Sequence, residues 1–195
     1  MTQASPPVAG LLLAAGAGRR FGGPKALAEL DGRPLVLRAL DALSAAGCDP
    51  IRVVIGAAAE QVRALLPEPR QAVFAESWET GMGASLKAGL AALSSEPGPV
   101  AALVHLVDLP WVGADVLTRV AANATTESVA RASYDGVPGH PVLFGRRWWS
   151  EIAGSAQGDR GARDWLSTRS ELTLVECGDL GSGRDVDRRA DLPGR

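Results

Sequence analysis

The sequence predicts an α/β fold in which helices cover both faces of a mostly parallel sheet. Residues 100–107 (VAALVHLV) form a long apolar run, as expected for a central strand that is buried on both faces. A second run, 51–55 (IRVVI), ends at Gly56, and segments with helical spacing separate the two runs. Strands that alternate with helices in this way predict β-α-β units with right-handed crossovers.

The first half of the chain provides most of these elements. An apolar segment through Val8 and 11–13 is the first expected strand, and a turn at 31–34 leads into a helix that ends near Gly47. Pro34 suits the first position of that helix. Its expected core-facing residues are Leu35, Leu37, Leu40 and Leu43. The other expected elements of this half are helices at 58–66 and 81–93 and strands at 51–55, 73–74 and 100–107.

The residue pattern changes from about residue 126. Strands at 128–133 and 141–144 are expected around a turn at 135–139, followed by a short helix at 146–153 and a last strand at 172–177. We expect a single domain over residues 1–195, in which about 126–170 is a small insertion that lies over the sheet.

Composition and charge narrow the possible classes of protein. The chain has 195 residues, of which 46% are hydrophobic and 22% charged, as in an ordinary globular protein. A net charge of -2 argues against a nucleic-acid partner, and no apolar run approaches the ~20 residues of a membrane span. Residues 1–10 lack the charged region of a secretory signal, and Cys48 and Cys177 have no C-x-x-C partner. We therefore expect a cytoplasmic protein with reduced thiols.

The stretch 11–27 (LLLAAGAGRRFGGPKAL) carries the strongest functional signal. Its glycines follow a buried strand, and Arg20 and Lys25 are interleaved with them. Glycine has no Cβ to hold a ligand away from the main chain, so such a loop exposes backbone N–H groups that bind anions. The cations would neutralise a polyphosphate. The simpler interpretation is a tight turn flanked by solvated charges.

Two better-known phosphate loops do not fit this stretch. A dinucleotide fingerprint requires G-x-G-x-x-G, but Phe21 stands at the third glycine position. A Walker loop requires G-x-x-x-x-G-K-[ST], but Pro24 precedes the lysine and Ala26 has no hydroxyl for magnesium.

The pattern L-A-A-G-x-G-x-R-x-G-x-P-K-x-L does fit. It is formed by Leu13, Ala14, Ala15, Gly16, Gly18, Arg20, Gly22, Pro24, Lys25 and Leu27. This pattern resembles the signature loop of the MobA-like NTP transferase family. The resemblance implies a three-layer, Rossmann-like α/β/α fold of the nucleotidyltransferase type. It also implies that the loop binds the nucleotide, with Arg20 and Lys25 neutralising the triphosphate and its leaving group during catalysis.

Three aspartates are candidate metal ligands. Asp108 directly follows the 100–107 run, where a carboxylate requires compensation by a cation or hydrogen bonds. Taken alone, Asp108 is interpreted as an N-cap for the next helix. In the family that the chain resembles, the aspartate at this position binds Mg²⁺ and takes part in catalysis. Asp185 and Asp187 alternate on an expected extended segment, so their side chains would point the same way. Family members have a similar D-x-D whose first aspartate completes the magnesium site, but Arg188 and Arg189 stand here where Thr-Pro is expected.

The segment 76–90 (ESWETGMGASLKAGL) resembles the part of the family that reads the nucleobase. The match implies that Gly81 lets the base approach the backbone and that Ser85 bonds its edge. Without the family, Ser85 is a polar residue near the start of a helix. The asparagine expected upstream is absent, and Ala75 and Glu76 stand there.

Two later motifs indicate the acceptor side of the site. They contain Gly139, His140 and Pro141 in the first motif and Gly158, Asp159 and Gly161 in the second. Taken singly, the histidine is structural and G-D-x-G is a turn. Together they resemble the molybdenum cofactor cytidylyltransferase branch, which joins CMP from CTP to the terminal phosphate of molybdopterin. By that resemblance they line a pterin pocket, and a molybdoenzyme receives the product. Trp148 and Trp149 have two uses open, stacking on a pterin or packing in the core.

The sequence leaves other functions open. The nearest is a guanylyltransferase that uses GTP on molybdopterin or on another phosphorylated small acceptor. A non-catalytic module that binds nucleotide or pterin would show binding without pyrophosphate release. A dinucleotide-dependent oxidoreductase is disfavoured by Phe21 and Lys25.

Overall fold

The computed structural model describes residues 6–193, in which seven strands form one sheet with the order β5-β4-β1-β6-β8-β7-β9. These strands are β1 (Val8–Leu13), β4 (Ile51–Ile55), β5 (Ala72–Phe74), β6 (Ala101–Leu106), β7 (Val129–Tyr134), β8 (Val137–Gly145) and β9 (Thr173–Glu176). Strand β8 runs antiparallel to its neighbours β6 and β7, and the other pairings are parallel. The predicted mostly parallel sheet is confirmed. A separate two-stranded ladder joins β2 (Glu29–Leu30) to β3 (Arg33–Pro34).

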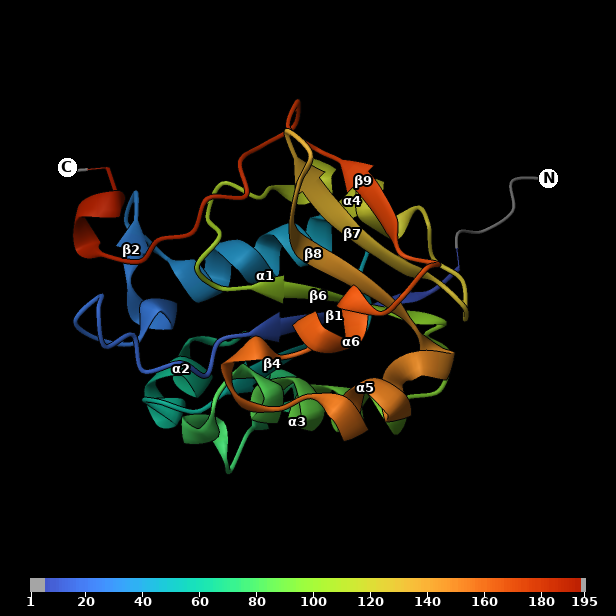
Figure 1. Cartoon of the computed structure of the whole chain (residues 1–195). Helices are drawn as coiled ribbons and strands as arrows, with labels where there is room; N and C mark the ends of the chain where they lie inside the picture. The colour runs from blue at the N-terminus through green and yellow to red at the C-terminus, as the bar shows by residue number, and fades with distance from the viewer. Residues whose placement is uncertain (1–5, 194–195) are drawn as a thin grey trace.

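Helices lie on both faces of the sheet, so the fold has the three predicted layers (Figure 1). One face packs against α1 (Leu35–Ala45), α2 (Ala59–Leu65) and α4 (Ala114–Ala121). The other packs against α3 (Met82–Ser94), α5 (Trp149–Ser155) and α6 (Arg163–Ser167). Short 3₁₀ turns are η1 (Lys25–Leu27), η2 (Pro69–Gln71), η3 (Trp78–Thr80), η4 (Arg146–Trp148), η5 (Gly158–Arg160) and η6 (Arg189–Asp191).

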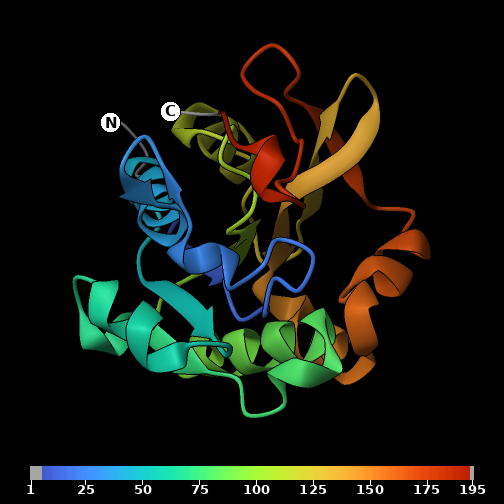
Figure 2. The ribbon, with the colours of Figure 1, turned by 90° about the vertical axis from the view of Figure 1, so that its left-hand side faces the viewer.

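The strand order reverses at β1, and this fixes where a ligand can bind. From β1 the chain crosses to β4 on one side, and it later returns to β6 on the other side. In such sheets the loops that follow the two central strands diverge and leave a crevice at the carboxyl ends of the strands. The blue loop after β1 and the red C-terminal segment lie together at this end of the sheet (Figures 1 and 2).

The expected elements of the first half are present within a few residues of their expected bounds. Strand β4 has the expected bounds 51–55, and α1 begins one residue after Pro34. Asp108 is not a helix N-cap, because the next helix begins at Ala114 and Gly113 is its N-cap.

The segment 126–170 differs from the expected insertion. Strands β7 and β8 continue the sheet beyond β6 and do not lie over it, whereas α5 and α6 cover one face. The expected turn at 135–139 is shorter, because Asp135 and Gly136 alone connect Tyr134 to Val137. Both residues have positive φ, 51° and 78°, which suits a tight hairpin whose twist matches that of its strands.

The structure bears on two of the expectations about the whole chain, and the third concerns residues that are only partly described. Within residues 6–193, none of the helices has the length and apolar character required to span a bilayer. Cys48 and Cys177 are both free and buried, and burial raises the pKa of the Cys48 thiol to about 12. The first five residues of the N-terminal stretch that was considered for a signal lie outside the described residues.

Candidate active site

The loop after β1 is a closed turn of glycines. The N–H groups of Gly22 and Gly23 both donate to the carbonyl oxygen of Gly18, at 2.9 and 3.1 Å. Gly18 has φ +61°, and a Cβ built on it would lie 1.9 Å from the carbonyl oxygen of Gly23. Glycine at position 18 is therefore a steric requirement of the loop.

Gly16 serves a different purpose. A Cβ at Gly16 would meet no atom within 4 Å, so the glycine leaves open space instead of fitting a tight turn. Among the described residues no acceptor faces the N–H groups of Gly16, Ala17 and Gly18. Successive free N–H groups beside open space are suited to binding phosphate oxygens.

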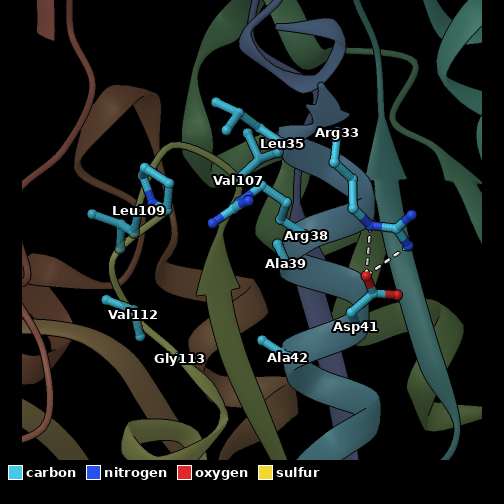
Figure 3. A pocket seen from close by; sticks show the side chains of 11 residues that line it. Arg33, Leu35, Arg38, Ala39, Asp41, Ala42, Val107, Leu109, Val112 and Gly113 are labelled. Atoms are coloured by element: carbon cyan, nitrogen blue, oxygen red, sulfur yellow. Dashed lines mark hydrogen bonds and ion pairs between the residues drawn. The ribbon is translucent and has the colours of Figure 1, made fainter. Parts of the chain in front are cut away.

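Gly16, Ala17 and Gly18 line a cleft of about 580 Å³ at the carboxyl ends of β1 and β6. Its lining contains most of the predicted nucleotide, phosphate and metal residues, namely Leu13, Ala14, Ala15, Gly16, Gly18, Arg20, Lys25, Gly81, Ser85, Asp108 and Asp187. A second, smaller pocket of about 240 Å³ lies between α1 and the 107–113 loop (Figure 3). There Arg33 pairs with Asp41, while Arg38 extends toward the loop. The two pockets have only Val107 in common among the described residues.

Lys25 joins two carboxylates at the centre of the cleft. Its Nζ lies 2.9 Å from Oδ2 of Asp108 and 3.7 Å from Oδ1 of Asp187. The Lys25 and Asp108 side chains are only 16% and 22% exposed, so water screens this pair weakly. Arg20 reaches the other oxygen of Asp187 at 2.7 Å, but its side chain is 78% exposed and free to turn toward a ligand.

A segment at the C-terminal end holds Asp187 in this position. The N–H of Val186 donates to the carbonyl oxygen of Asp108 at 2.9 Å, which fastens the segment to the end of β6. The carboxylate of Asp191 accepts from the N–H groups of Asp187 and Arg188 at 2.9 and 2.7 Å, and these bonds lower the pKa of Asp191. Arg189 lies 5.0 Å from the centre of the Phe21 ring. Arg188 and Arg189 therefore lie in a turn that is stabilised by the hydrogen bonds that the carboxylate of Asp191 accepts.

The three candidate metal ligands do not gather at one point. Asp187 reaches the cleft, whereas Asp185 is exposed and is absent from the cleft lining. Across residues 6–193 there is no cluster of three or more His, Cys, Asp or Glu side chains that could hold a metal ion. Asp108 and Asp187 form a pair of carboxylates, which fits an ion such as Mg²⁺ that binds one or two carboxylates, phosphate oxygens and water.

The end of the cleft that the sequence predicts to bind the nucleobase contains an unpaired hydroxyl. Ser85 is only 5% exposed, and its Oγ has no hydrogen-bond partner within the described chain although the residue lines the cleft. Ser85 Oγ is not among the fully buried side-chain atoms without a partner in the described chain, so the hydroxyl can be reached from the cleft and is free to bond a ligand atom. Trp78, which the sequence reasoning did not assign, also lines this end and packs against Gly56. The sequence signal that could have identified Trp78 is its place in the segment 76–90, which resembles the part of the family that reads the nucleobase.

The predicted acceptor residues divide into two groups. Asp159 lines the same cleft as the glycine loop, and Gly161 packs on Met82, which also lines that cleft. Gly139, His140 and Pro141 lie at the start of β8 and are not part of the cleft lining. Trp149 is buried and donates to the carbonyl oxygen of Phe144, and the Trp148 and Trp165 rings pack edge to face. Both tryptophans at 148 and 149 are thus used in packing.

The two histidines are held in the neutral form. Burial lowers the pKa of His105 to about 4. Burial and the nearby Arg131, His105 and Arg163 lower the pKa of His140 to about 3. Arg131 donates through Nε to the carbonyl oxygen of Gly139 at 3.1 Å, and within the described residues it forms no ion pair. His140 is consequently available as a neutral hydrogen-bonding group at physiological pH.

Comparison with known proteins places this geometry in a family. Residues 10–173 match the family model described as MobA-like NTP transferase domain. The match includes the glycine loop, Lys25, Ser85 and Asp108 and ends before Asp187.

Individual relatives extend the comparison to nearly the whole chain. The chain is 37% identical over 193 residues to a protein of Paenarthrobacter nicotinovorans named nicotine blue oxidoreductase, with 93% of each sequence covered. The crystal structure of Rv0371c from Mycobacterium tuberculosis H37Rv superposes with a TM-score of 0.79 at 27% identity and covers 96% of each chain. A complex of Rv0371c with manganese gives a TM-score of 0.71 at 26% identity, with 87% of this chain and 88% of that chain covered.

Proposed function

The chain belongs to the MobA-like NTP transferase domain family, and we propose that it transfers CMP from CTP to the terminal phosphate of molybdopterin or molybdenum cofactor. The family match makes it an enzyme of the nucleotidyltransferase type. The choice of CTP and of the pterin acceptor rests on the two acceptor-side motifs and their likeness to the cytidylyltransferase branch. The free cysteines suit the reducing cytoplasm, where we place the reaction.

The observation that carries the proposal is Lys25 between Asp108 and Asp187 beside a glycine loop with free N–H groups. The loop N–H groups and Lys25 would hold the triphosphate, and Arg20 would turn from Asp187 to its outer phosphates. An oxygen of the acceptor phosphate would attack the α-phosphorus in line. The new P–O bond forms as the bond to the β-phosphate oxygen breaks, and pyrophosphate leaves with the electron pair. The protein thus acts by positioning and by charge neutralisation.

A divalent cation fits the same pair of carboxylates. We propose Mg²⁺ held by Asp108 and Asp187, where it would supply positive charge to the triphosphate. In this arrangement Lys25 gives up part of its contact with the carboxylates and becomes available to the phosphates. Asp108 then orients Lys25 and the ion together, which explains a carboxylate at the end of a buried strand.

Pyrophosphate release tests the proposal directly. We expect release from CTP only when molybdopterin and Mg²⁺ are both present, together with a cytidylylated pterin in the mass spectrum. Formation of a guanylylated pterin from GTP would support the transferase activity but show that the base is guanine and not cytosine. Tight nucleotide binding with no pyrophosphate under any of these conditions would contradict catalysis and favour the non-catalytic binding module.

The name of the relative in Paenarthrobacter nicotinovorans favours one second candidate, an oxidoreductase. Such an enzyme would bind a dinucleotide such as NADPH in the same cleft. The loop does not carry the G-x-G-x-x-G fingerprint, and Lys25 with two carboxylates is better suited to a triphosphate. Oxidation of NADPH with a quinone-like dye as electron acceptor, measured as the loss of NADPH absorbance, would support this candidate.

A further inference from the structure

The loop that carries Asp159 is packed against the nucleobase end of the cleft. A Cβ on Gly81 would lie 2.4 Å from the carbonyl carbon of Gly158 and 2.6 Å from Oδ1 of Asp159. Two residues further, a Cβ on Gly83 would lie 2.7 Å from the backbone nitrogen of Gln157. Glycines at the start of α3 therefore let η5 approach, and this contact fixes Asp159 beside Gly81.

The carboxylate of Asp159 is an acceptor that the protein itself does not use. Within the described residues it forms no hydrogen bond or ion pair, whereas Asp164 nearby pairs with Arg160 at 2.9 Å. Asp159 is exposed and lines the same cleft as Gly81 and Ser85. The position is thus open to a ligand that approaches Gly81.

The chemistry of a carboxylate limits which base edge can face it. An ionised carboxylate only accepts hydrogen bonds, while the hydroxyl of Ser85 can donate or accept. Cytosine presents an amino group at ring position 4, and the pyrimidines with a carbonyl there present an acceptor. A carboxylate opposite a carbonyl oxygen would leave two acceptors facing each other without a proton, which costs binding energy.

We propose that Asp159 is a specificity-determining residue that accepts a hydrogen bond from the exocyclic amine of the nucleobase. The cleft then selects nucleotides whose base carries such an amine and rejects UTP. This assignment rests on the proposed function, and it moves Asp159 from the acceptor to the nucleotide. Ser85 bonds a second atom of the same edge, so the base is held from α3 and from η5 together.

The substitution D159N tests this assignment, because an asparagine amide can donate to the carbonyl of uracil. The dissociation constants of CTP and UTP are measured with Mg²⁺ on the wild type and on the variant. We expect the wild type to prefer CTP by at least ~10-fold, the effect of about 1.4 kcal/mol. In D159N this ratio falls at least ~10-fold, through weaker CTP and stronger UTP binding. In D159A, which removes the acceptor without adding a donor, CTP weakens and UTP does not gain.

The variant D164N is the matched control, since it makes the same change in the neighbouring helix α6 and outside the cleft. We expect D164N to keep the wild-type ratio. Glu79 in η3 is another carboxylate that lines the cleft. A ratio unchanged in D159N, or a ratio changed by E79Q and not by D159N, would overturn the assignment while leaving triphosphate binding intact. If GTP binds best, the pair GTP and ITP replaces CTP and UTP, because ITP lacks the amine. Failure of the wild type to bind any triphosphate would overturn the proposed function and this inference with it.

Discussion

The end of the cleft around Lys25, which we name the phosphate end, and the start of β8 differ in the state of their ionisable side chains. At the phosphate end, Lys25, Asp108, Asp187 and Arg20 are partnered with one another within 3.7 Å. At the start of β8, His140 is kept neutral by burial and by nearby arginines, and Arg131 has no acidic partner among the described residues. In the first region the ionised side chains are held in ion pairs. In the second region burial keeps His140 neutral beside the cationic Arg131. A ligand at the first region must exchange partners, and a ligand at the second meets neutral or cationic groups.

The largest effect is expected from K25A at the phosphate end. Without Lys25 the triphosphate and leaving group lose their buried cation, and Asp108 and Asp187 lose their shared partner. We expect turnover to fall by about 10²–10³-fold, as for the loss of one preorganised transition-state donor. Steady-state pyrophosphate release measures this, with K87A on the exposed side of α3 as the control. Turnover near the wild-type value in K25A would remove Lys25 from the mechanism.

The pair D187N and D185N separates the two aspartates of the C-terminal motif. Asp187 contacts Lys25 and Arg20, while Asp185 is exposed outside the cleft. We expect D187N to reduce the Mg²⁺-dependent tightening of CTP binding by about 10-fold or more, the loss typical of a metal-site partner. D185N should leave it within twofold. Calorimetry at several Mg²⁺ concentrations makes the comparison, and a larger loss in D185N would assign the ion to the other aspartate.

The pair G18A and G16A tests whether the glycines of one loop have different tasks. In G18A the new Cβ meets the carbonyl oxygen of Gly23 at a residue with φ +61°, so the loop must rearrange. We expect a loss of about 1–3 kcal/mol in unfolding free energy together with weaker nucleotide binding. In G16A the Cβ enters open space, so stability should stay within about 0.5 kcal/mol while the nucleotide weakens. Urea unfolding of both variants gives the result, and equal stabilities would contradict it.

The smallest effect is expected from H140Q at the start of β8. The unfolded chain protonates this histidine below its ordinary pKa of 6.5, and the folded protein does so only near pH 3. His140 therefore makes stability fall as pH drops from 6.5 toward 3, and the full stability is present above 6.5. Near pH 5, H140Q should bind about one proton less on unfolding than the wild type. The slope of the unfolding free energy against pH should therefore be smaller by up to ~1.4 kcal/mol per pH unit. Urea unfolding between pH 4.5 and 7.5 measures the slope, and an unchanged slope would place a charged His140 in the folded protein.

The same contrast explains what could be predicted from the sequence. The glycine loop and the end of β6 are local patterns, so the meeting of Lys25 and Asp108 in one cleft followed from the carboxyl-end rule. The assignment of Ser85 to this site came only from the family resemblance of segment 76–90, and Ser85 lines the same cleft. The order of β7, β8 and β9 depends on pairing between distant strands, and the apolar pattern of a strand does not identify its partner. The segment 126–170 was therefore expected over the sheet when its strands are part of it.

The side-chain placements that could not be predicted have the same origin. The family motif implied that Asp159 binds the acceptor, and only the packing of η5 on Gly81 brings Asp159 to the cleft that the glycine loop also lines. The resemblance implied that Asp185, the first aspartate of the D-x-D, completes the metal site, whereas it is Asp187 that lines the cleft. The hydrogen bonds from Val186 to Asp108 and from Asp187 to Asp191 decide which of them enters the cleft, and both bonds join residues through the fold.

The most direct test of the account is the thermal stability of the wild type with CTP, GTP, ATP, UTP or NADPH, each with and without Mg²⁺. The account predicts selective stabilisation by CTP that requires Mg²⁺. At 100 times the dissociation constant this amounts to about 2.7 kcal/mol, or a shift of about 5–11 °C for a chain of this size. Selective stabilisation by GTP with Mg²⁺ would retain the transferase and change its base. Stabilisation by NADPH alone, without any Mg²⁺-dependent response to a triphosphate, would contradict the central claim that this cleft binds a metal-bound triphosphate.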